Sequence, residues 1–278
     1  MINEIASGIV LYNPEIERLR QNLDAVSSQV SEIFLVDNAS ENITEIEALL
    51  TDYPKCRLIK NTKNSGIARG LNQIMASARQ VGYRWVLTLD DDSICDSDLV
   101  ARLSLYTSLD KAGIICPLAA DDRIESVKTN PLQREYMEVR DCITAGSLTN
   151  VSVWSETGGF DEKMFIDFVD IEYCTRIREY GYKIWRISGT YVHQRYGNIK
   201  GSFQLFGKKF YLFDYSPVRV YYSVRNQIYF MKKHRSQISI CHQLIYLIGY
   251  IGKRIVFEGN RVESLISVCR GIRDGIRM

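Results

Sequence analysis

Three consecutive carboxylates end an apolar run in the first third of the sequence. Asp90, Asp91 and Asp92 follow directly on the β-prone residues 84–89. Adjacent carboxylates repel one another unless a cation gathers them, and oxygen-only ligands suit Mg²⁺ or Mn²⁺. Such an ion would screen the negative charge that builds up on a departing diphosphate. The alternative interpretation is an acidic turn that caps a helix starting near residue 96.

A second pair of carboxylates lies among bulky apolar residues. Asp167 and Asp170 belong to the segment 164–170, whose other members are all apolar. Apolar surroundings can raise the pKa of a carboxyl group toward neutrality, which suits a general base. Asp170 is therefore the candidate base that takes a proton from an attacking hydroxyl group. Capping of the following helix is the alternative, and the two roles are compatible.

Weaker signals point to further contacts with a metal or a phosphate. His193 follows a β-type segment and could complete a metal shell, although a histidine with a satisfied hydrogen bond is the alternative. Residues 64–70 join a predicted strand to a predicted helix, so their backbone amides and Arg69 could approach a phosphate. A simple turn is the alternative there, because the segment has neither the P-loop nor the Rossmann glycine pattern. Arg225 lies in an aromatic run typical of core packing and could also reach a diphosphate.

Alternating strands and helices position these residues in the first half of the chain. Apolar, β-prone runs predict strands, at 5–12, 32–36, 56–60 and 84–89. Apolar residues at helical spacing predict helices, at 16–26, 44–50 and 67–81. Short connections between them predict a parallel, doubly wound sheet. Ligands of such sheets bind beyond the carboxyl ends of the strands, so we expect Asn13, Asp37, Asn38 and the acidic triplet to converge on one crevice.

The second half is less regular and predicts a mixed sheet followed by helices. The predicted strands are 113–116, 124–127, 139–143, 183–187 and 191–193. The predicted helices are 171–180, which ends at a glycine cap, and then 218–233, 237–257 and 262–272. We expect a catalytic domain at 1–215, with a nucleotide-binding half at 1–95 and an acceptor half at 96–215. Residues 216–278 are expected to form a helical extension.

Composition and charge limit the class of protein. The 278 residues are 46% hydrophobic and 24% charged, which is typical of a soluble globular protein. Seven scattered cysteines without a Cys-x-x-Cys pair predict reduced thiols. The N-terminus resembles no signal peptide and no run reaches the length of a membrane span, so a cytoplasmic location is expected.

The net charge of +2 argues against a nucleic-acid binder, yet the charge is unevenly distributed. From residue 232 onward there are nine Lys or Arg against three Asp or Glu. A basic, amphipathic tail could rest as a peripheral contact on an anionic membrane surface. It could equally be the solvated face of packed helices or contact a second subunit.

Taken in order, the motifs resemble family 2 of the glycosyltransferases over roughly residues 5–230. The matching segments are 10–14, 35–40, 64–72, 89–93, 145–148, 158–162 and 165–181. Each segment alone is only weakly diagnostic of the family, but the order of all seven along the chain is specific to it. Residues 165–174 and the Asp-x-Asp-Ser form of 90–93 are similar to the bacterial rhamnosyltransferases that build O-antigen and other cell-wall polysaccharides. The resemblance implies an α/β fold of the GT-A type, a divalent metal cofactor, dTDP-L-rhamnose as donor and a glycan or lipid-linked glycan as acceptor.

The resemblance also implies roles for individual residues. Tyr12 would stack on the nucleotide base, Asp37 would accept its imide proton, and Asp90 would hold the ribose. Asp92 would bind the metal with help from His193, and Asp170 matches the catalytic base of the family. Further contacts with the nucleotide sugar are expected from Asn13, Asn64, Arg69, Asp91, Gly146 and Arg225. Contacts on the acceptor side are expected from Trp154 and Asp167.

Two positions depart from the family pattern. Leu11 replaces a threonine that often precedes the tyrosine, which puts one contact with the base in question. Val169 stands where many relatives carry a glutamate before the base, and this is typical of the rhamnosyl branch.

The implied reaction is a single in-line displacement that inverts the anomeric configuration, since no second nucleophile is evident. The first alternative is the same fold with a UDP-sugar donor carrying galactose, galactofuranose or N-acetylglucosamine. The second is a non-catalytic subunit that binds nucleotide sugars. A nucleotidyltransferase would need a glycine- and lysine-rich loop after the first strand, and residues 13–15 do not provide one.

Overall fold

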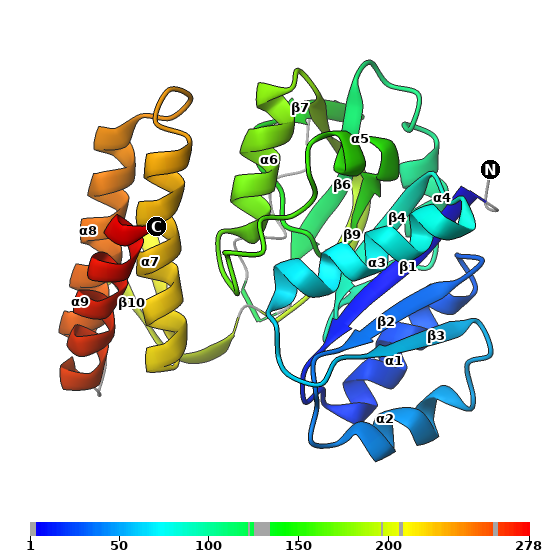
Figure 1. Ribbon diagram of the computed structural model, residues 1–278, viewed down its shortest axis with the longest axis horizontal. Helices are drawn as coiled ribbons and strands as arrows, with labels where there is room; N and C mark the ends of the chain where they lie inside the picture. The colour runs from blue at the N-terminus through cyan, green and yellow to red at the C-terminus, as the bar shows by residue number, and fades with distance from the viewer. Residues whose placement is uncertain (1–3, 122, 125–133, 196, 206–207, 258–260) are drawn as a thin grey trace. The chain divides into compact units, whose positions relative to one another are not determined.

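The computed structural model describes residues 4–121, 123–124, 134–195, 197–205, 208–257 and 261–278 (Figure 1). The strands are β1 (Ile5–Leu11), β2 (Ile33–Asp37), β3 (Cys56–Lys60), β4 (Trp85–Asp90), β5 (Ile94–Cys95), β6 (Ala112–Ala120), β7 (Tyr136–Val139), β8 (Ser147–Asn150), β9 (Lys183–His193), β10 (Asn198–Leu205) and β11 (Lys208–Asp214). The helices are α1 (Ile16–Ser27), α2 (Ile43–Leu50), α3 (Ile67–Val81), α4 (Leu99–Ser104), α5 (Val151–Glu156), α6 (Val169–Glu179), α7 (Pro217–Lys233), α8 (Ile240–Phe257) and α9 (Arg261–Arg277).

The chain divides into two compact units. Unit 1 comprises Met1–Lys163 and Val169–Arg195, and unit 2 comprises Met164–Phe168 and Tyr196–Met278. These units are defined by contacts within the structure. The expected division into a catalytic domain at 1–215 and a helical extension at 216–278 stays a prediction.

The central sheet of unit 1 has the strand order β3-β2-β1-β4-β8-β6-β9-β5, and β7 pairs with β9. Strands β3, β2, β1 and β4 are parallel. Strand β8 runs antiparallel to both β4 and β6, whereas β6 and β9 are parallel. The predicted α/β fold, with a parallel first half and a mixed second half, is confirmed.

The two faces of β1 explain why helices cover both sides of the sheet. A side chain at Gly8 would overlap Ile74 of α3, so α3 packs directly against the strand backbone on that face. Ile9 points to the opposite face and is fully buried in a cluster with Leu19 and Leu23 of α1. The alternation of side chains along a strand therefore gives β1 one helix layer on each face.

Two sequence predictions in the second half need correction. The predicted strand at 139–143 is wrong, because β7 ends at Val139. The carbonyls that follow accept side-chain hydrogen bonds instead of ladder bonds: Ser147 Oγ donates to Ile143 O (2.7 Å) and Thr88 Oγ1 donates to Thr144 O (2.6 Å).

The predicted strands at 183–187 and 191–193 are one strand, β9. The register with β6 jumps from Arg186 to Tyr191, and Gly189 lies within the jump at φ +71°. This bulge separates the two segments that the sequence analysis predicted as independent strands. The predicted strand at 124–127 falls almost entirely outside the described residues, and β5, β8, α5, β10 and β11 were not predicted. Helix α4 entered the sequence analysis only through the alternative of a helix that starts near residue 96, and it begins at Leu99.

Unit 2 combines the β10–β11 hairpin with α7, α8 and α9, coloured yellow to red in Figure 1. Helix α9 packs closely on α7 because two glycines face it: a Cβ at Gly271 would lie 2.8 Å from Tyr221 O, and one at Gly275 would lie 2.7 Å from Arg225 O. Within the described parts of the chain, every helix is too short or too polar to cross a bilayer.

Helix α6 contains a buried ion pair, and the arginine of that pair also bonds the helix to Thr157, the residue after α5. The Glu172 carboxylate accepts hydrogen bonds from Arg176 Nε (2.8 Å) and Nη2 (2.7 Å), and the two side chains are 0% and 11% exposed. Arg176 also donates to the carbonyl of Thr157. These bonds fix the first turns of α6, where Asp170 lies.

We expect Glu172→Gln to lower the free energy of unfolding of unit 1 by about 3 kcal/mol, because it leaves the Arg176 charge buried without its carboxylate. The three tryptophans, at positions 85, 154 and 185, all belong to unit 1, so urea unfolding followed by tryptophan fluorescence reports on it. Asp98→Asn is the matched control, since it breaks an exposed pair with Arg102 at the same spacing. In that control the free energy of unfolding should fall by less than about 1 kcal/mol. Equal losses in the two variants would show that burial does not strengthen the Glu172 pair.

Candidate active site

The carboxyl ends of β1, β2 and β4 lie side by side. The parallel register pairs Leu11 with Asp37 and Val10 with Asp90. The Asn38 amide donates to Leu11 O (2.9 Å), which extends the pairing past the strand ends. The structure therefore brings together the residues that follow these three strands, as expected for a ligand-binding edge of a parallel sheet.

The loops after β1 and β2 are tied to each other. The Asp37 carboxylate is 2% exposed and accepts from the Ser40 amide at 3.1 Å and 3.3 Å. Ser40 Oγ accepts from the Asn13 amide (2.8 Å), and Asn13 Oδ1 accepts from the Glu41 amide (2.7 Å). Asn13 has φ +51°, a conformation that asparagine tolerates well. These bonds hold the two loops in fixed positions, while the neighbouring Tyr12 side chain is 51% exposed.

Helix α1 holds the backbone of the acidic turn. Asn22 Nδ2 donates to Asp90 O (2.7 Å), and Arg18 Nε donates to Asp92 O (2.7 Å). The Ser93 amide closes the turn onto Asp90 O (3.2 Å). The helix-cap alternative for the triplet is wrong, because α4 begins only at Leu99 and β5 intervenes.

The carboxylates of the turn are crowded and partly withdrawn from water. Burial, together with the neighbouring charge of Asp92, raises the pKa of Asp91 to about 7. Backbone amides, among them that of Tyr12, donate to the Asp91 carboxylate and oppose this effect. Burial likewise raises the pKa of Asp92, and the positive charges of Arg18 and Arg195 partly offset it. The turn is therefore short of positive charge.

His193 lies beside this turn at the end of β9. It pairs with Ile94 of β5 and with Ala120 of β6, and its Nε2 lies 3.3 Å from Asp96 Oδ1. This contact fits the alternative of a histidine with a satisfied hydrogen bond, and a role at the metal stays a prediction. Among the residues the structure describes, no three His, Cys, Asp or Glu side chains are gathered around a metal position.

The donor set of the turn nevertheless fits Mg²⁺ or Mn²⁺. Mg²⁺ is usually held by one or two carboxylates together with the phosphates of a substrate, and not by an all-protein cage. The raised pKa values of Asp91 and Asp92, which result mainly from burial, are consistent with a cation at the turn.

The segment before β8 passes directly beside the end of β4. The Gly146 amide donates to Thr88 O (2.7 Å). Gly146 has φ +79°, and a Cβ there would lie 2.7 Å from Val192 Cβ, so only glycine fits this approach. The predicted contact of Gly146 with a nucleotide sugar stays a prediction, and its position next to β4 is consistent with one.

A series of short contacts links the first turns of α6 to the end of β4. Asp170 lies in the first turn of α6, and its Oδ1 accepts from the Ile171 amide (2.8 Å). One turn further on, Cys174 Sγ lies 3.8 Å from Cys142 Sγ. Cys142 Sγ lies 3.7 Å from Ser147 Oγ, and Ser147 pairs with Thr88 in the sheet. All these residues belong to unit 1, so the helix bearing Asp170 is joined through 142–147 to the strand bearing the acidic triplet.

Three other predicted site residues in unit 1 have structural partners. Asn64 Oδ1 accepts from the Gly66 amide (3.0 Å), which is the turn that the sequence offered as the alternative. Arg69 Nη1 lies 3.8 Å from Glu162 Oε2 in an exposed pair. Trp154 Nε1 donates to Asn72 Oδ1 (3.0 Å), which joins α5 to α3. The roles of all three at a substrate stay predictions.

The remaining two, Asp167 and Arg225, belong to unit 2. The Asp167 carboxylate is bonded by Arg219 (3.1 Å to Nη2) and by the hydroxyl of Ser223. The Arg225 guanidinium lies 4.6 Å from the centre of the Tyr222 ring and donates to Asn226 Oδ1. These bonds place both side chains in the internal packing of unit 2, and their roles toward an acceptor or a diphosphate also stay predictions.

Arg18 and Asn22 are the residues of the site that the sequence analysis missed. They are four residues apart and so share one face of α1. Asn22 is 0% exposed and lies among the buried positions Leu19, Leu23 and Val26. A polar residue within an apolar helical stripe was the signal that could have revealed the pair.

The model of "Glycosyl transferase family 2" matches residues 8–175, a range that contains both the acidic turn and Asp170. The dTDP-rhamnosyl transferase RfbF of Shigella flexneri is 28% identical over 293 residues, which cover 100% of this chain and 97% of that protein.

Two solved glycosyltransferase structures resemble the fold. GalNAc-T7, solved with UDP, GalNAc and Mn²⁺, matches with a TM-score of 0.63 at 13% identity, over 99% of this chain and 56% of that one. S. aureus TarS 1-349 in complex with UDP-GlcNAc matches with a TM-score of 0.58 at 12% identity, over 99% of this chain and 81% of that one. The chain thus spans little more than half the length of GalNAc-T7, and at these identities both likenesses concern the fold alone.

The fold is of the GT-A type and the chain is a glycosyltransferase. Because the family model covers more than half of its length, the protein belongs to glycosyltransferase family 2.

Proposed function

We propose that this glycosyltransferase transfers L-rhamnose from dTDP-L-rhamnose to a hydroxyl group of a glycan acceptor in bacterial surface polysaccharide synthesis. The observation that carries the proposal is the 28% identity, over essentially the full length of both chains, to a relative named as a dTDP-rhamnosyl transferase. The acceptor we favour is a lipid-linked glycan at the inner face of the plasma membrane.

Residues at the ends of β1, β2 and β4 would bind the donor. The exposed Tyr12 ring can stack on the base. The Asp37 carboxylate, already bonded by one backbone amide, has lone pairs left for an imide N–H. Asp90 would hold the ribose. Gly146 brings its backbone close to the same edge of the sheet.

Asp92, with His193 beside the turn, would hold a divalent cation. When bound, Mg²⁺ or Mn²⁺ supplies positive charge to the diphosphate as it leaves. The support for this assignment is the pair of crowded carboxylates with raised pKa values. A structural neighbour crystallised with Mn²⁺ is consistent with it.

Asp170 would act as the general base. It accepts the proton of the acceptor hydroxyl as that oxygen bonds to the anomeric carbon of rhamnose. The bond from that carbon to the diphosphate oxygen breaks, and its electron pair leaves with dTDP. Attack and departure on opposite faces invert the anomeric configuration. The contacts through Cys174, Cys142 and Ser147 support a common site for Asp170 and the acidic turn.

A UDP-sugar donor is the second candidate. The solved neighbours of the fold are described with UDP, GalNAc and UDP-GlcNAc. Their identities of 12% and 13% favour this donor class less than the full-length relative favours dTDP-rhamnose.

We expect Asp170→Asn to lower the turnover number by about 10² to 10⁴-fold, because a carboxamide cannot accept the hydroxyl proton. Binding of dTDP-rhamnose should change less than about twofold, since the substitution preserves shape and Asp170 is assigned no contact with the nucleotide. Turnover is measured by dTDP release, and donor binding by calorimetry. Asp98→Asn, at an exposed side chain just before helix α4, is the control that should behave as the unmodified protein. A variant at position 170 with an unchanged turnover number would refute the assignment of the base.

Thermal unfolding in the presence of candidate donors should identify the sugar nucleotide. With dTDP-rhamnose and MnCl₂ at about 100 times the dissociation constant, stabilisation of about 2.7 kcal/mol is expected, which is a rise of several degrees in Tm. Asp92→Asn should remove the part that depends on Mn²⁺. Strong stabilisation by UDP-galactose or UDP-N-acetylglucosamine, with none by dTDP-rhamnose, would contradict the proposed donor.

A further inference from the structure

Helices α8 and α9 of unit 2 expose an unusual number of large apolar side chains. Ile245 and Ile248 of α8 are 70% and 68% exposed, and Val262 of α9 is 72% exposed. We call this surface the α8–α9 face, and its apolar members are Leu244, Ile245, Ile248, Val262, Leu265 and Ile266.

Helical spacing puts these side chains on one continuous surface. Helix α9 turns Gly271 and Gly275 toward α7, and Val268 toward the small core that it shares with Leu247 of α8. Successive residues of a helix are rotated by about 100°. Moving around α9 from Val268 away from α7, the next side chains on its surface are therefore Leu265, Val262 and Ile266.

Helix α8 shows the corresponding arrangement. Its Gln243 carbonyl accepts from Gln227 of α7 (3.0 Å), and Leu247 faces the core. The arc beyond Leu247 carries Leu244, Ile248 and Ile245. Leu247 of α8 and Val268 of α9 meet in this core. The exposed apolar side chains of the two helices therefore lie next to each other, on the side of the helix pair that faces solvent.

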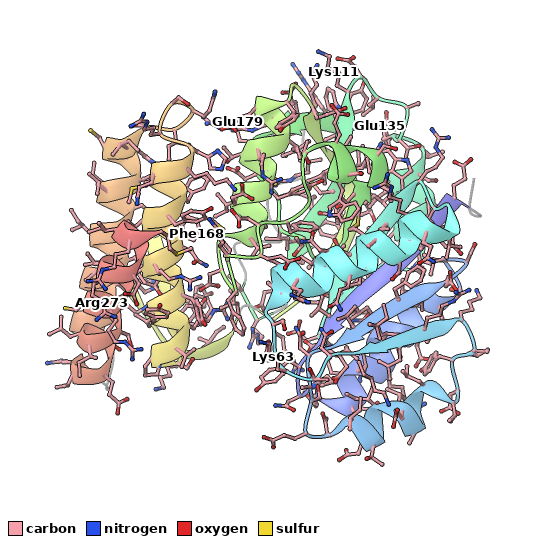
Figure 2. The ribbon with its side chains drawn as sticks, in the orientation of Figure 1. Lys63, Lys111, Glu135, Phe168, Glu179 and Arg273 are labelled. Carbon is pink, nitrogen blue, oxygen red and sulfur yellow. The ribbon has the colours of Figure 1, made fainter. Side chains whose placement is uncertain are left out.

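Positive charge borders this apolar surface. Arg270, Arg273 and Arg277 are exposed, and their spacing places them along one edge of the α9 arc; Figure 2 shows the Arg273 side chain on α9. The nearby Asp274 carboxylate forms an ion pair with Arg273 (2.8 Å) and accepts a hydrogen bond from the Tyr221 hydroxyl (3.0 Å). Residues 216–278 as a whole contain eleven Lys or Arg against three Asp or Glu.

We infer that the α8–α9 face binds the surface of an anionic lipid bilayer, with both helices lying in the plane of the interface. An exposed apolar stripe bordered by arginines is the pattern of helices that insert at the boundary of head groups and acyl chains. The negative potential of an anionic leaflet attracts basic segments at short range. A second copy of the chain fits the face less well, because two surfaces with the same excess of positive charge repel each other.

The inference goes beyond the proposed function, because binding to lipid requires no transfer activity. It gives the protein a peripheral position in which a lipid-linked acceptor would lie close to the enzyme. The two claims can fail independently. Vesicle binding tests whether the α8–α9 face binds lipid, and turnover on a soluble acceptor analogue tests the proposed transfer reaction.

Sedimentation of the full chain with vesicles tests the inference. Vesicles of phosphatidylglycerol and phosphatidylcholine in equal parts should bind the protein, phosphatidylcholine alone should bind it much less, and added salt should weaken the binding. The double variant Ile245→Asn/Ile266→Asn should bind at least about tenfold more weakly, because two side chains no longer enter the apolar layer. Arg273→Gln/Arg277→Gln should lose about tenfold on the anionic vesicles only.

Matched controls lie on exposed positions of unit 1. Leu105→Asn removes an apolar side chain that is 67% exposed, and Arg84→Gln removes a charge that is also at the surface. Both should bind vesicles as the unmodified chain does. Circular dichroism checks the helix content of every variant. If Ile245→Asn/Ile266→Asn loses helix, Arg273→Gln/Arg277→Gln provides the test instead.

Equal binding to both kinds of vesicle would overturn the inference, and so would equal losses in the control variants. Sedimentation equilibrium without lipid gives a further check. A dimer that Ile245→Asn/Ile266→Asn dissociates would identify a second copy of the chain as the occupant of the face and would also overturn it.

Discussion

The carboxylates of Asp91 and Asp92 share a turn that is partly withdrawn from water, and the burial of these acidic groups is the constraint on which the site depends. Burial and the neighbouring charge raise the pKa of Asp91 to about 7, so ionising both groups is unfavourable without a cation. Helix α1 uses Arg18 and Asn22 to hold the carbonyls of the turn, and the charge of Arg18 offsets only part of the effect of burial on Asp92. The proposed metal ion, arriving with a diphosphate, would supply the positive charge that this turn lacks.

The rest of unit 1 brings other groups to the same edge of the sheet. The parallel register of β1, β2 and β4 aligns the ends of three strands, and Gly146 lets the following segment pass close to β4. The contacts through Cys142 and Cys174 join α6 to that segment, and Arg176, which pairs with Glu172 within α6, bonds the helix to the carbonyl of Thr157. Unit 2 contributes a different property, an exposed apolar and basic surface that the proposed catalytic chemistry does not use.

Much of the fold could be predicted because the first half of the chain follows simple rules. Strands β1 to β4 and helices α1 to α3 are apolar at regular spacing, and each depends mainly on its own residues. The prediction at 139–143 failed because the carbonyls of Ile143 and Thr144 bond to the side chains of Ser147 and Thr88. The single strand at 183–193 was predicted as two because a bulge at Gly189 interrupts it. The acidic triplet was visible in the sequence. Its support by Arg18 was not, because nothing local links residue 18 to residue 92.

The central claim is that the acidic turn and Asp170 act on the same sugar from opposite sides. A crystal structure of the Asp170→Asn variant with dTDP-L-rhamnose and Mn²⁺ tests it most directly, since the variant should leave the donor intact. The account predicts that the Asp92 carboxylate contacts the metal at the diphosphate, while the side chain at position 170 faces the anomeric carbon from the opposite side of the ring. A complex in which the two side chains lie in separate regions, with the rhamnose touching only one of them, would contradict it.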